Sequence, residues 1–249
     1  MMKYFYFFFL LFIFSTAYTQ DQKLHDEART LERQFKTEEA ILVYQEILRK
    51  EPSDQQVLLR ITELYCMLGN EFEQEEKKIQ HFQLAASFAD KLWNIDSATA
   101  DAHYAKALII GRMIAFSTVR EKAMMTKKLK DEVDKALQIQ PSHVKAMYTL
   151  AKWNDEVSSL NPAARAALKV FFGGLPPASV DEAIKLYQSV RKLSPTFILN
   201  NYDLALALKK TGKSDQAIEI LNAQMKYPVK SREDQHFKNK SRELLSSLQ

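Results

Sequence analysis

The stretch ALQIQPSHVKAMYTLA, residues 136–151, contains the end of one expected helix, a proline and the beginning of the next helix. Proline lacks a backbone N–H and clashes with the preceding turn, so it ends one helix and is tolerated at the start of another. Three further segments end in a similar way, the last with serine in place of proline: LRKEP at 48–52, VRKLSP at 190–195 and LWNIDS at 92–97. This recurrence predicts a chain of similar helical units.

Small and apolar residues recur at fixed distances before these four terminators. The residues twelve positions earlier are Ala40, Ala85, Leu129 and Ala183. The residues five positions earlier are Ile47, Leu92, Ala136 and Val190. A small residue lets two helices approach closely, and an apolar residue fills the core that they share. We therefore expect each terminator to close the second helix of a packed pair.

This pattern resembles the tetratricopeptide repeat, a helix–turn–helix unit of about 34 residues. The segments ADAHYAKA at 100–107 and VKAMYTLA at 144–151 fit the opening residues of that repeat. The resemblance implies an all-α, right-handed α-solenoid of about five tetratricopeptide-like helix pairs, in one repeat domain over residues 21–249. The segment SRED at 231–234 is a capping-box sequence, which predicts a C-terminal capping helix.

One unit holds an insertion, because 54 residues separate Pro141 from Pro195. The dipeptide Asn161-Pro162 is typical of a helix start with proline in the first turn. We expect an extra helix over residues 163–172, followed by a rigid loop, GGLPP, at 173–177. The apolar residues of this helix are compatible with two roles: packing on the solenoid, or forming an element at a membrane interface.

With this insertion the chain resembles a more specific family, called regulator of microtubule dynamics. The resemblance is carried by the segments IIGR at 109–112, LAKWNDEV at 150–157, FFGGLPPAS at 171–179 and YPVK at 227–230. Ala-Lys at 151–152 stands where that family usually has Gly-Arg. The resemblance implies the fold and a non-enzymatic, partner-binding character; some relatives are linked to membrane contacts and lipid handling. Microtubule association is not carried over, because we expect this chain to be exported.

Residues 1–20 have the layout of a signal peptide. Lys3 supplies positive charge, residues 4–14 are uninterruptedly apolar, and small residues follow at 15–17. The apolar run is shorter than the ~20 residues that span a bilayer as a helix. We expect removal of residues 1–20 and a periplasmic or secreted protein, with an uncleaved N-terminal anchor as the alternative.

Composition and motifs indicate no catalytic, metal or cofactor site. The net charge of +4 is small, and the positive and negative residues are mostly mixed along the sequence, which argues against nucleic-acid binding. Cys66 is the only cysteine, so neither an intrachain disulfide nor a cysteine-based zinc site can form. The five histidines lack metal-ligand spacing, and we expect His103 to be a satisfied, partly buried side chain.

A tyrosine ladder is the candidate binding feature. Tyr104, Tyr148 and Tyr202 take the same place in three successive repeats, and Lys152 and Leu206 follow one helical turn later. In tetratricopeptide superhelices this place faces the concave groove, where a tyrosine offers a large contact area and a hydroxyl group. The alternative is that these rings only pack neighbouring first helices together.

Two function classes remain open. The first is an extracytoplasmic adaptor that binds a segment of an unidentified protein or peptide partner in its groove. The second is a carrier of lipids or other amphiphiles at the cell envelope, with peripheral membrane contact. A deep, closed cavity favours the carrier, and an open groove favours the adaptor.

Overall fold

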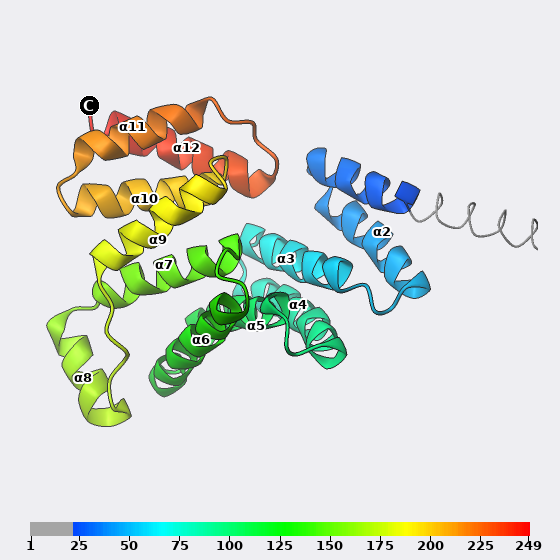
Figure 1. The fold of residues 1–249 in the computed structure, drawn as a ribbon, viewed down its shortest axis with the longest axis horizontal. Helices are drawn as coiled ribbons and strands as arrows, with labels where there is room; N and C mark the ends of the chain where they lie inside the picture. The colour runs from blue at the N-terminus through cyan, green and yellow to red at the C-terminus, as the bar shows by residue number, and fades with distance from the viewer. Residues whose placement is uncertain (1–21) are drawn as a thin grey trace, which may run out of the picture.

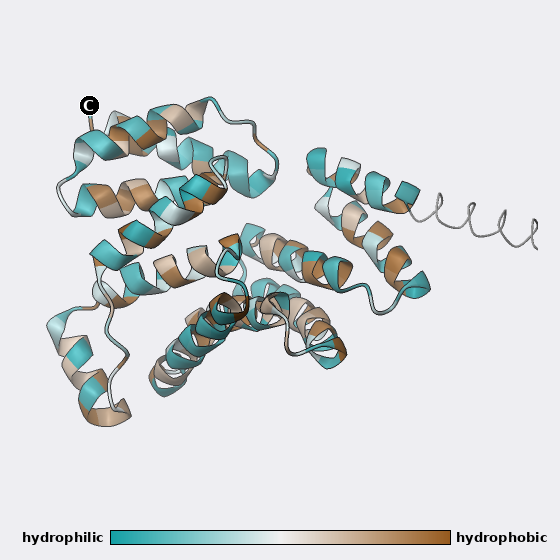
Figure 2. Ribbon diagram, viewed as in Figure 1, coloured by the Kyte–Doolittle hydropathy of each residue, from teal (hydrophilic) through white to brown (hydrophobic). Residues whose placement is uncertain are grey.

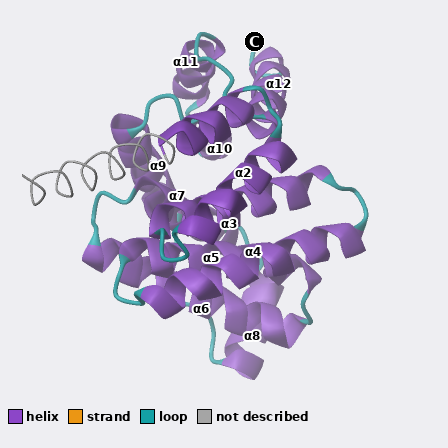
Figure 3. Cartoon of the chain, turned by 90° about the vertical axis from the view of Figure 1, so that its right-hand side faces the viewer, coloured by secondary structure: helices purple, strands orange, loops and turns teal. Residues whose placement is uncertain are grey.

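The computed structural model describes residues 22–249, and among them every regular element is a helix (Figures 1 and 3). The prediction of a signal peptide lies outside the described residues. After a helix over residues 22–33, the elements are α2 (Thr37–Lys50), α3 (Gln55–Glu71), α4 (Glu75–Ile95), α5 (Ala100–Met113), the 3-10 helix η1 (Ile114–Phe116), α6 (Val119–Ile139), α7 (Val144–Ser158), α8 (Pro162–Phe172), α9 (Val180–Leu193), α10 (Ile198–Lys210), α11 (Ser214–Met225) and α12 (Arg232–Ser246). In this part of the chain, no helix combines the length and apolarity needed to span a bilayer.

The helices form five consecutive pairs, as the repeat pattern predicts: 22–33 with α2, α3 with α4, α5 with α6, α7 with α9, and α10 with α11. The second helices of the first four pairs each end two residues before their terminator, at Lys50, Ile95, Ile139 and Leu193. Figure 1 shows the pairs following one another along a curved path. The all-α solenoid predicted from the repeats is confirmed.

The predicted spacing of small and apolar residues identifies the core. Ala40, Ala85 and Ala183 are completely buried, and Leu129 is nearly so. The four positions five residues before the terminators are buried as well. Figure 2 shows the same division, with hydrophobic and hydrophilic colours alternating around the repeat helices. Each pair is therefore held together along the faces that the sequence indicates.

Polar side chains fix where several helices begin. Asp54 accepts a hydrogen bond from the Val57 amide, 2.9 Å away, at the start of α3. Thr118 and Glu121 form a reciprocal capping box at the start of α6. Such caps satisfy amide groups that have no partner within the helix. They set the start of these helices independently of tertiary packing.

The inserted helix α8 forms as predicted, but it contributes no buried residue. Asn161 Oδ1 accepts a hydrogen bond from the Ala164 amide at 2.7 Å, and Pro162 occupies the first turn. Gly173 ends the helix with φ 72°, a left-handed conformation that suits glycine. The end of α8 is attached to α6 by Lys127, whose Nζ donates to the Phe172 carbonyl at 2.7 Å.

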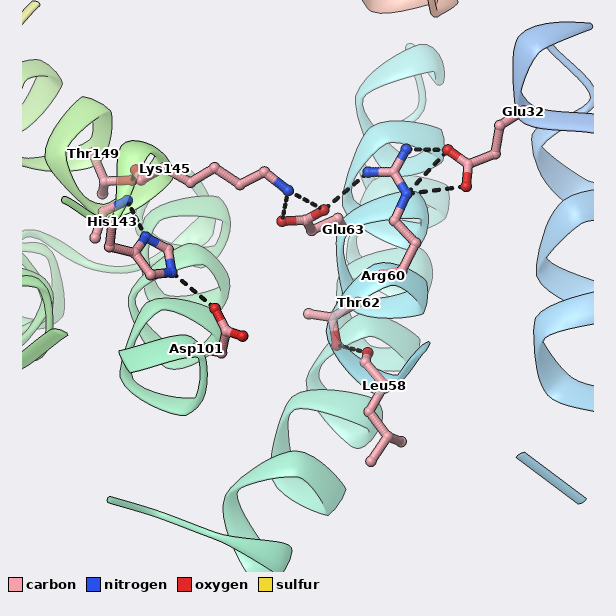
Figure 4. A network of polar contacts seen from close by, with 10 residues as sticks. Glu32, Leu58, Arg60, Thr62, Glu63, Asp101, His143, Lys145 and Thr149 are labelled. Atoms are coloured by element: carbon pink, nitrogen blue, oxygen red, sulfur yellow. Dashed lines mark hydrogen bonds and ion pairs between the residues drawn. The ribbon is translucent and has the colours of Figure 1, made fainter. Parts of the chain in front are cut away.

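A network of charged side chains links the first helices of three of the helix pairs (Figure 4). Arg60 on α3 forms ion pairs with both Glu32, from helix 22–33, and Glu63. Lys145 on α7 lies 2.5 Å from Glu63, so the chain of contacts passes from the first unit to the fourth. Burial alone would raise the pKa of Glu32, but the hydrogen bond and charge of Arg60 hold it below its ordinary value. The pairing with Arg60 therefore favours the charged form of Glu32.

The C-terminal helix α12 packs on α10 and α11 and also reaches back to the second unit. Ser231 caps it by accepting from the Asp234 amide at 3.0 Å, and Asp234 in turn accepts from the Lys230 amide at 2.9 Å. Arg232 pairs with Glu71 at the end of α3, with 2.9 Å between Nη1 and Oε2. The predicted capping helix thus also bridges the two sides of the curved path.

Candidate functional site

A cavity of about 1260 Å³ lies inside the curve. Its lining comes from α3, α5, α6 and α7, from the inserted helix α8, and from the beginnings of α10 and α12. Pockets for drug-sized ligands usually have about 300–1,000 Å³. The space is therefore large enough for a long ligand or a segment of another chain.

One side of the cavity is formed by α6, α7 and α8 and is mainly apolar. The inserted helix presents Ala164, Ala167, Leu168, Phe171 and Phe172 to the cavity. Its counterparts on α6, at the spacing of one helix face, are Val119, Lys122, Ala123 and Thr126. Trp153 of α7 fixes this arrangement, because its indole Nε1 donates to the Thr126 carbonyl at 2.9 Å.

The opposite end of the cavity is charged. Arg112 of α5 and Glu233 of α12 both line it, close to the Arg232–Glu71 ion pair. Burial raises the pKa of Glu233, and the positive charge of Arg112 only partly opposes this effect. Within the described residues, the Arg112 Nε atom is buried without a hydrogen-bond partner. The Arg112 guanidinium, which lines this end, offers positive charge and hydrogen-bond donors to a polar group of a ligand.

Tyr148 and Lys152 of α7 line the cavity, and both contact Asp203 of α10. The Tyr148 hydroxyl donates to Asp203 Oδ2 at 2.7 Å, and Lys152 Nζ lies 3.6 Å from the same oxygen. Burial raises the pKa of Asp203, while Lys152 and Tyr148 act in the opposite direction. The two predicted site residues are thus held in place by one buried carboxylate.

The other three predicted residues, Tyr104, Tyr202 and Leu206, do not line this cavity. Tyr104 is 6% exposed, and its ring centroid lies 5.1 Å from that of His143. Tyr202 packs against Phe237, a residue of α12 that lines the cavity, with 5.4 Å between centroids. Leu206 is partly buried against the core of the last two units. The structure thus separates the five residues into two on the cavity surface and three packed behind or away from it.

Several cavity residues do not appear in the tyrosine-ladder prediction. Arg112 occurs in the IIGR segment, and Phe171 and Phe172 occur in the inserted helix, so both regions carried a sequence signal. Glu233 lies in the SRED segment, which predicts a helix start and not a cavity residue, and Phe237 carried no signal. The place of both in the cavity depends on how far the superhelix curves. A residue at the C-terminus enters the site only when the path of the repeats brings it back to α3 and α5.

Two titratable residues that lie outside this cavity, His103 and Cys66, are paired or buried. His103 is buried, and its Nδ1 lies 2.6 Å from Glu132 Oε2. Cys66 is buried, and burial raises the pKa of its thiol to about 12, so the reactive thiolate is scarce at neutral pH. Across residues 22–249 no group of three or more His, Cys, Asp or Glu side chains could hold a metal ion.

Comparison with proteins of known structure supports the fold. A thermophilic TPR protein of Thermus thermophilus superposes with a TM-score of 0.62 at 12% sequence identity, covering 92% of this chain and 98% of that chain. At this level of identity the likeness concerns the fold alone.

Comparison with known sequences identifies the family. Regulator of microtubule dynamics protein 3 of Rattus norvegicus is 22% identical over 193 residues, which are 77% of this chain and 41% of the relative. Protein 1 of Mus musculus is 22% identical over 219 residues, 86% of this chain and 71% of the relative. The chain thus spans less than half of the first relative. The family model described as Regulator of microtubule dynamics protein 1-3 matches residues 22–249, and the chain therefore belongs to this family.

Proposed function

We propose that this protein is a non-enzymatic binding module whose cavity holds an apolar segment of a partner protein. The observation that carries the proposal is the cavity of about 1260 Å³, with apolar side chains on one side and charged groups at the other end. Apolar side chains of a partner would bury their surface against α6 and α8, which is the main source of binding free energy in such grooves.

The charged end supports an ordered mode of binding. The Arg112 guanidinium lines the cavity from α5, and the polar side chains of Lys152 and Tyr148 line it from α7. An apolar segment alone has no preferred direction in the cavity. A carbonyl or carboxylate at one end of the segment would be directed toward Arg112, because hydrogen bonds from a charged donor to such an acceptor are strong. The proposed partner segment is therefore apolar along its length and carries an acceptor at one end.

A non-catalytic role is part of the proposal and rests on the chemistry of the cavity. Lys152 Nζ lies 3.6 Å from Asp203 Oδ2, and the positive charge of Arg112 lowers the pKa of Glu233 against the effect of burial. The described lining holds no serine or cysteine, and its two threonine hydroxyls, of Thr126 and Thr149, donate to backbone carbonyls of their own helices. The relatives are named as regulators, which agrees with a binding role.

The experiment uses two neighbouring alanines of α8. Both alanines are exposed, but Ala167 lines the cavity and Ala166 does not. A photo-reactive amino acid at position 168 would first capture and identify the partner in the native envelope. Affinity for that partner is then measured for Ala167→Trp and Ala166→Trp. We expect at least tenfold weaker binding for Ala167→Trp alone; equal affinities would reject the cavity as the binding site.

The second candidate function is the binding of an amphiphile with an acyl chain. The observation that favours it is the Arg232–Glu71 ion pair, which bridges the two sides of the curve beside the cavity. A bridged cavity admits a slender ligand more easily than a folded segment. Native mass spectrometry of the purified protein tests this function: a bound lipid that is retained in Ala166→Trp and lost in Ala167→Trp would replace the partner-segment proposal.

The proposed location is the periplasm or the outside of the cell, which follows from the composition of residues 1–20. N-terminal sequencing of the protein recovered from the envelope tests this location. A chain that starts near residue 21 supports it. A chain that still begins at Met1 would favour the anchored alternative.

A further inference from the structure

Exposed apolar side chains gather where the end of α8 meets the beginning of α6. In residues 22–249 nine large apolar side chains are exposed, and four of them belong to these two segments. Val119 and Met124 of α6 are 72% and 61% exposed, and Val170 and Phe171 of α8 are 76% and 73% exposed. Exposed apolar residues at this density mark an interaction surface.

The two segments are joined in space. Lys127 of α6 donates a hydrogen bond to the Phe172 carbonyl of α8, and Val119 and Phe171 line the same cavity. Figures 1 and 3 both place α8 and the adjacent end of α6 at one extremity of the molecule, and Figure 2 shows hydrophobic colour at the end of α8. We call residues 119–128 and 162–172 together the α6–α8 tip.

The tip is also strongly basic. It contains six basic residues and one acidic residue, a net charge of +5, whereas the entire chain has a net charge of +4. The acidic residue, Glu121, is engaged with Thr118 in the capping box. Four of the cations are exposed and form no ion pair within the described residues: Arg120, Lys122, Lys128 and Lys169. The tip therefore combines apolar side chains with unneutralised positive charge.

We infer that the α6–α8 tip docks on a membrane surface that contains anionic lipids. Side chains such as Phe171 and Val170 would enter the boundary between headgroups and acyl chains, while the surrounding lysines and arginines contact the headgroups. A second copy of the chain is disfavoured as the occupant, because two tips of charge +5 repel each other. The absence of buried residues in α8 leaves its apolar side chains available for this contact.

The test uses the full chain and a probe at the tip itself. Phe171→Cys is labelled with a nitroxide; Cys66 does not compete, because it is buried and its thiol pKa is raised to about 12. Leu42→Cys on α2 is the matched control, since Leu42 is 64% exposed and lies near acidic Glu38, Glu39 and Glu46. Accessibility to oxygen and to a polar nickel complex is compared with and without phosphatidylcholine vesicles containing phosphatidylglycerol.

We expect oxygen accessibility to rise at position 171 and not at position 42 when vesicles are added. In the labelled chain, Lys128→Gln and Lys169→Gln should each raise about fivefold the lipid concentration at which half of the change in oxygen accessibility is reached. This factor is equivalent to about 1 kcal/mol per cation. Val119→Ser with Val170→Ser should also weaken the effect, whereas Ile139→Ser with Leu193→Ser, at exposed positions outside the tip, should not.

Three results would overturn the inference. Label 171 could remain as water-exposed as label 42 on vesicle-bound protein. The change in oxygen accessibility at position 171 could be the same with vesicles of neutral phosphatidylcholine alone and could be unchanged by the lysine substitutions. Spin–spin broadening between labels at position 171 without vesicles would show that a second copy covers the tip. Far-ultraviolet circular dichroism of each variant verifies that the helices are retained.

Discussion

Helices α8 and α9 follow one another in the chain, yet only α9 contributes to the core. Both begin with a capping side chain, Asn161 for α8 and Ser179 for α9, and both carry apolar residues on one side. Helix α9 buries Ala183, Ile184, Tyr187 and Val190 against α7 and α10, whereas α8 buries nothing. Local sequence therefore determines that a helix forms, and the repeat register determines whether its apolar face finds a partner.

The contrast between α8 and α9 also distinguishes two structural roles in this molecule. The repeat helices supply stability through close contacts at small residues, as at the fully buried Ala183. The elements outside the repeat, α8 and the beginning of α12, complete the cavity and carry its exposed or charged parts. Substitutions of the same chemistry should therefore have different consequences in the two regions.

Ala183→Trp should give the largest effect, a loss of about 3 kcal/mol in the free energy of unfolding. A completely buried alanine between α9 and its partners leaves no room for an indole, so the helices must separate or adopt strained side-chain conformations. Ala217→Trp, at an equally buried position of α11, should behave in the same way. Denaturant unfolding followed by circular dichroism measures both variants.

Ala166→Trp on α8 is the control for this comparison. Ala166 is exposed, so the same substitution should change the free energy of unfolding by no more than about 0.5 kcal/mol. Equal losses at positions 166 and 183 would mean that α8 is as integral to the core as α9. Unchanged midpoints at both 183 and 217 would show that the repeat register is wrong.

Tyr148→Phe should cost about 2 kcal/mol, because it leaves the buried Asp203 carboxylate without one of its donors. Tyr202→Phe is the matched control: Tyr202 packs on Phe237, and no hydrogen bond of its hydroxyl is found in the described part of the chain, so we expect little change. Unfolding free energies of the two variants decide whether the hydroxyl is structural at Tyr148 and not at Tyr202. Similar values for both would remove this distinction.

Most of the fold could be predicted from the sequence because it depends on local and periodic signals. Proline and serine terminators, small residues such as Ala40 and Ala85, and the Asn161-Pro162 start each act within a few turns of their own helix. Such signals do not depend on how successive pairs are oriented. The five pairs, the insertion and the final helix follow from them directly.

The cavity was less accessible to prediction, because it depends on the accumulated curvature of the repeats. Tyr148 and Lys152 were selected for their place in the repeat, and they line the cavity. Tyr104 has the same place, but its ring is buried beside His143 of the next unit. A small change in the angle between successive pairs changes which side chain is covered. No periodic signal in a single sequence reports that angle.

Glu233 gives a prediction for the charged end, where an element outside the repeat meets α5. Its pKa is raised above 4.5 in the folded protein, mainly by burial, so the folded state binds more protons than the unfolded state above that pH. Stability contributed by this group is therefore lost as pH rises. The free energy of unfolding of Glu233→Gln relative to that of the wild type should therefore increase as pH rises above about 4.5.

Asp101 supplies the control of opposite sign. Its pKa is lowered below 3.8, chiefly by the hydrogen bond with His143, so its contribution is present above that pH and is lost on acidification. The wild type should accordingly lose its advantage over Asp101→Asn as pH falls below about 3.8. If Glu233→Gln followed the same direction as Asp101→Asn, the buried position of Glu233 at the charged end would be contradicted.

The Arg232–Glu71 ion pair should give the smallest effect, although it bridges elements 161 positions apart in the chain. Its side chains are about half and one-third exposed, so water and salt weaken the attraction, and we expect a coupling energy of about 0.5 kcal/mol. A double-mutant cycle with Arg232→Ala and Glu71→Ala measures this coupling energy, with the Lys185–Glu182 pair inside α9 as the control.

A coupling energy near that of the control, reduced by salt, would mean that α12 holds its place through its packing on α10 and α11. A coupling above about 2 kcal/mol would instead make the bridge a structural contact comparable to the core, because exposed pairs do not reach that value. In that case the division between repeat helices that stabilise and added elements that complete the cavity would no longer hold for α12.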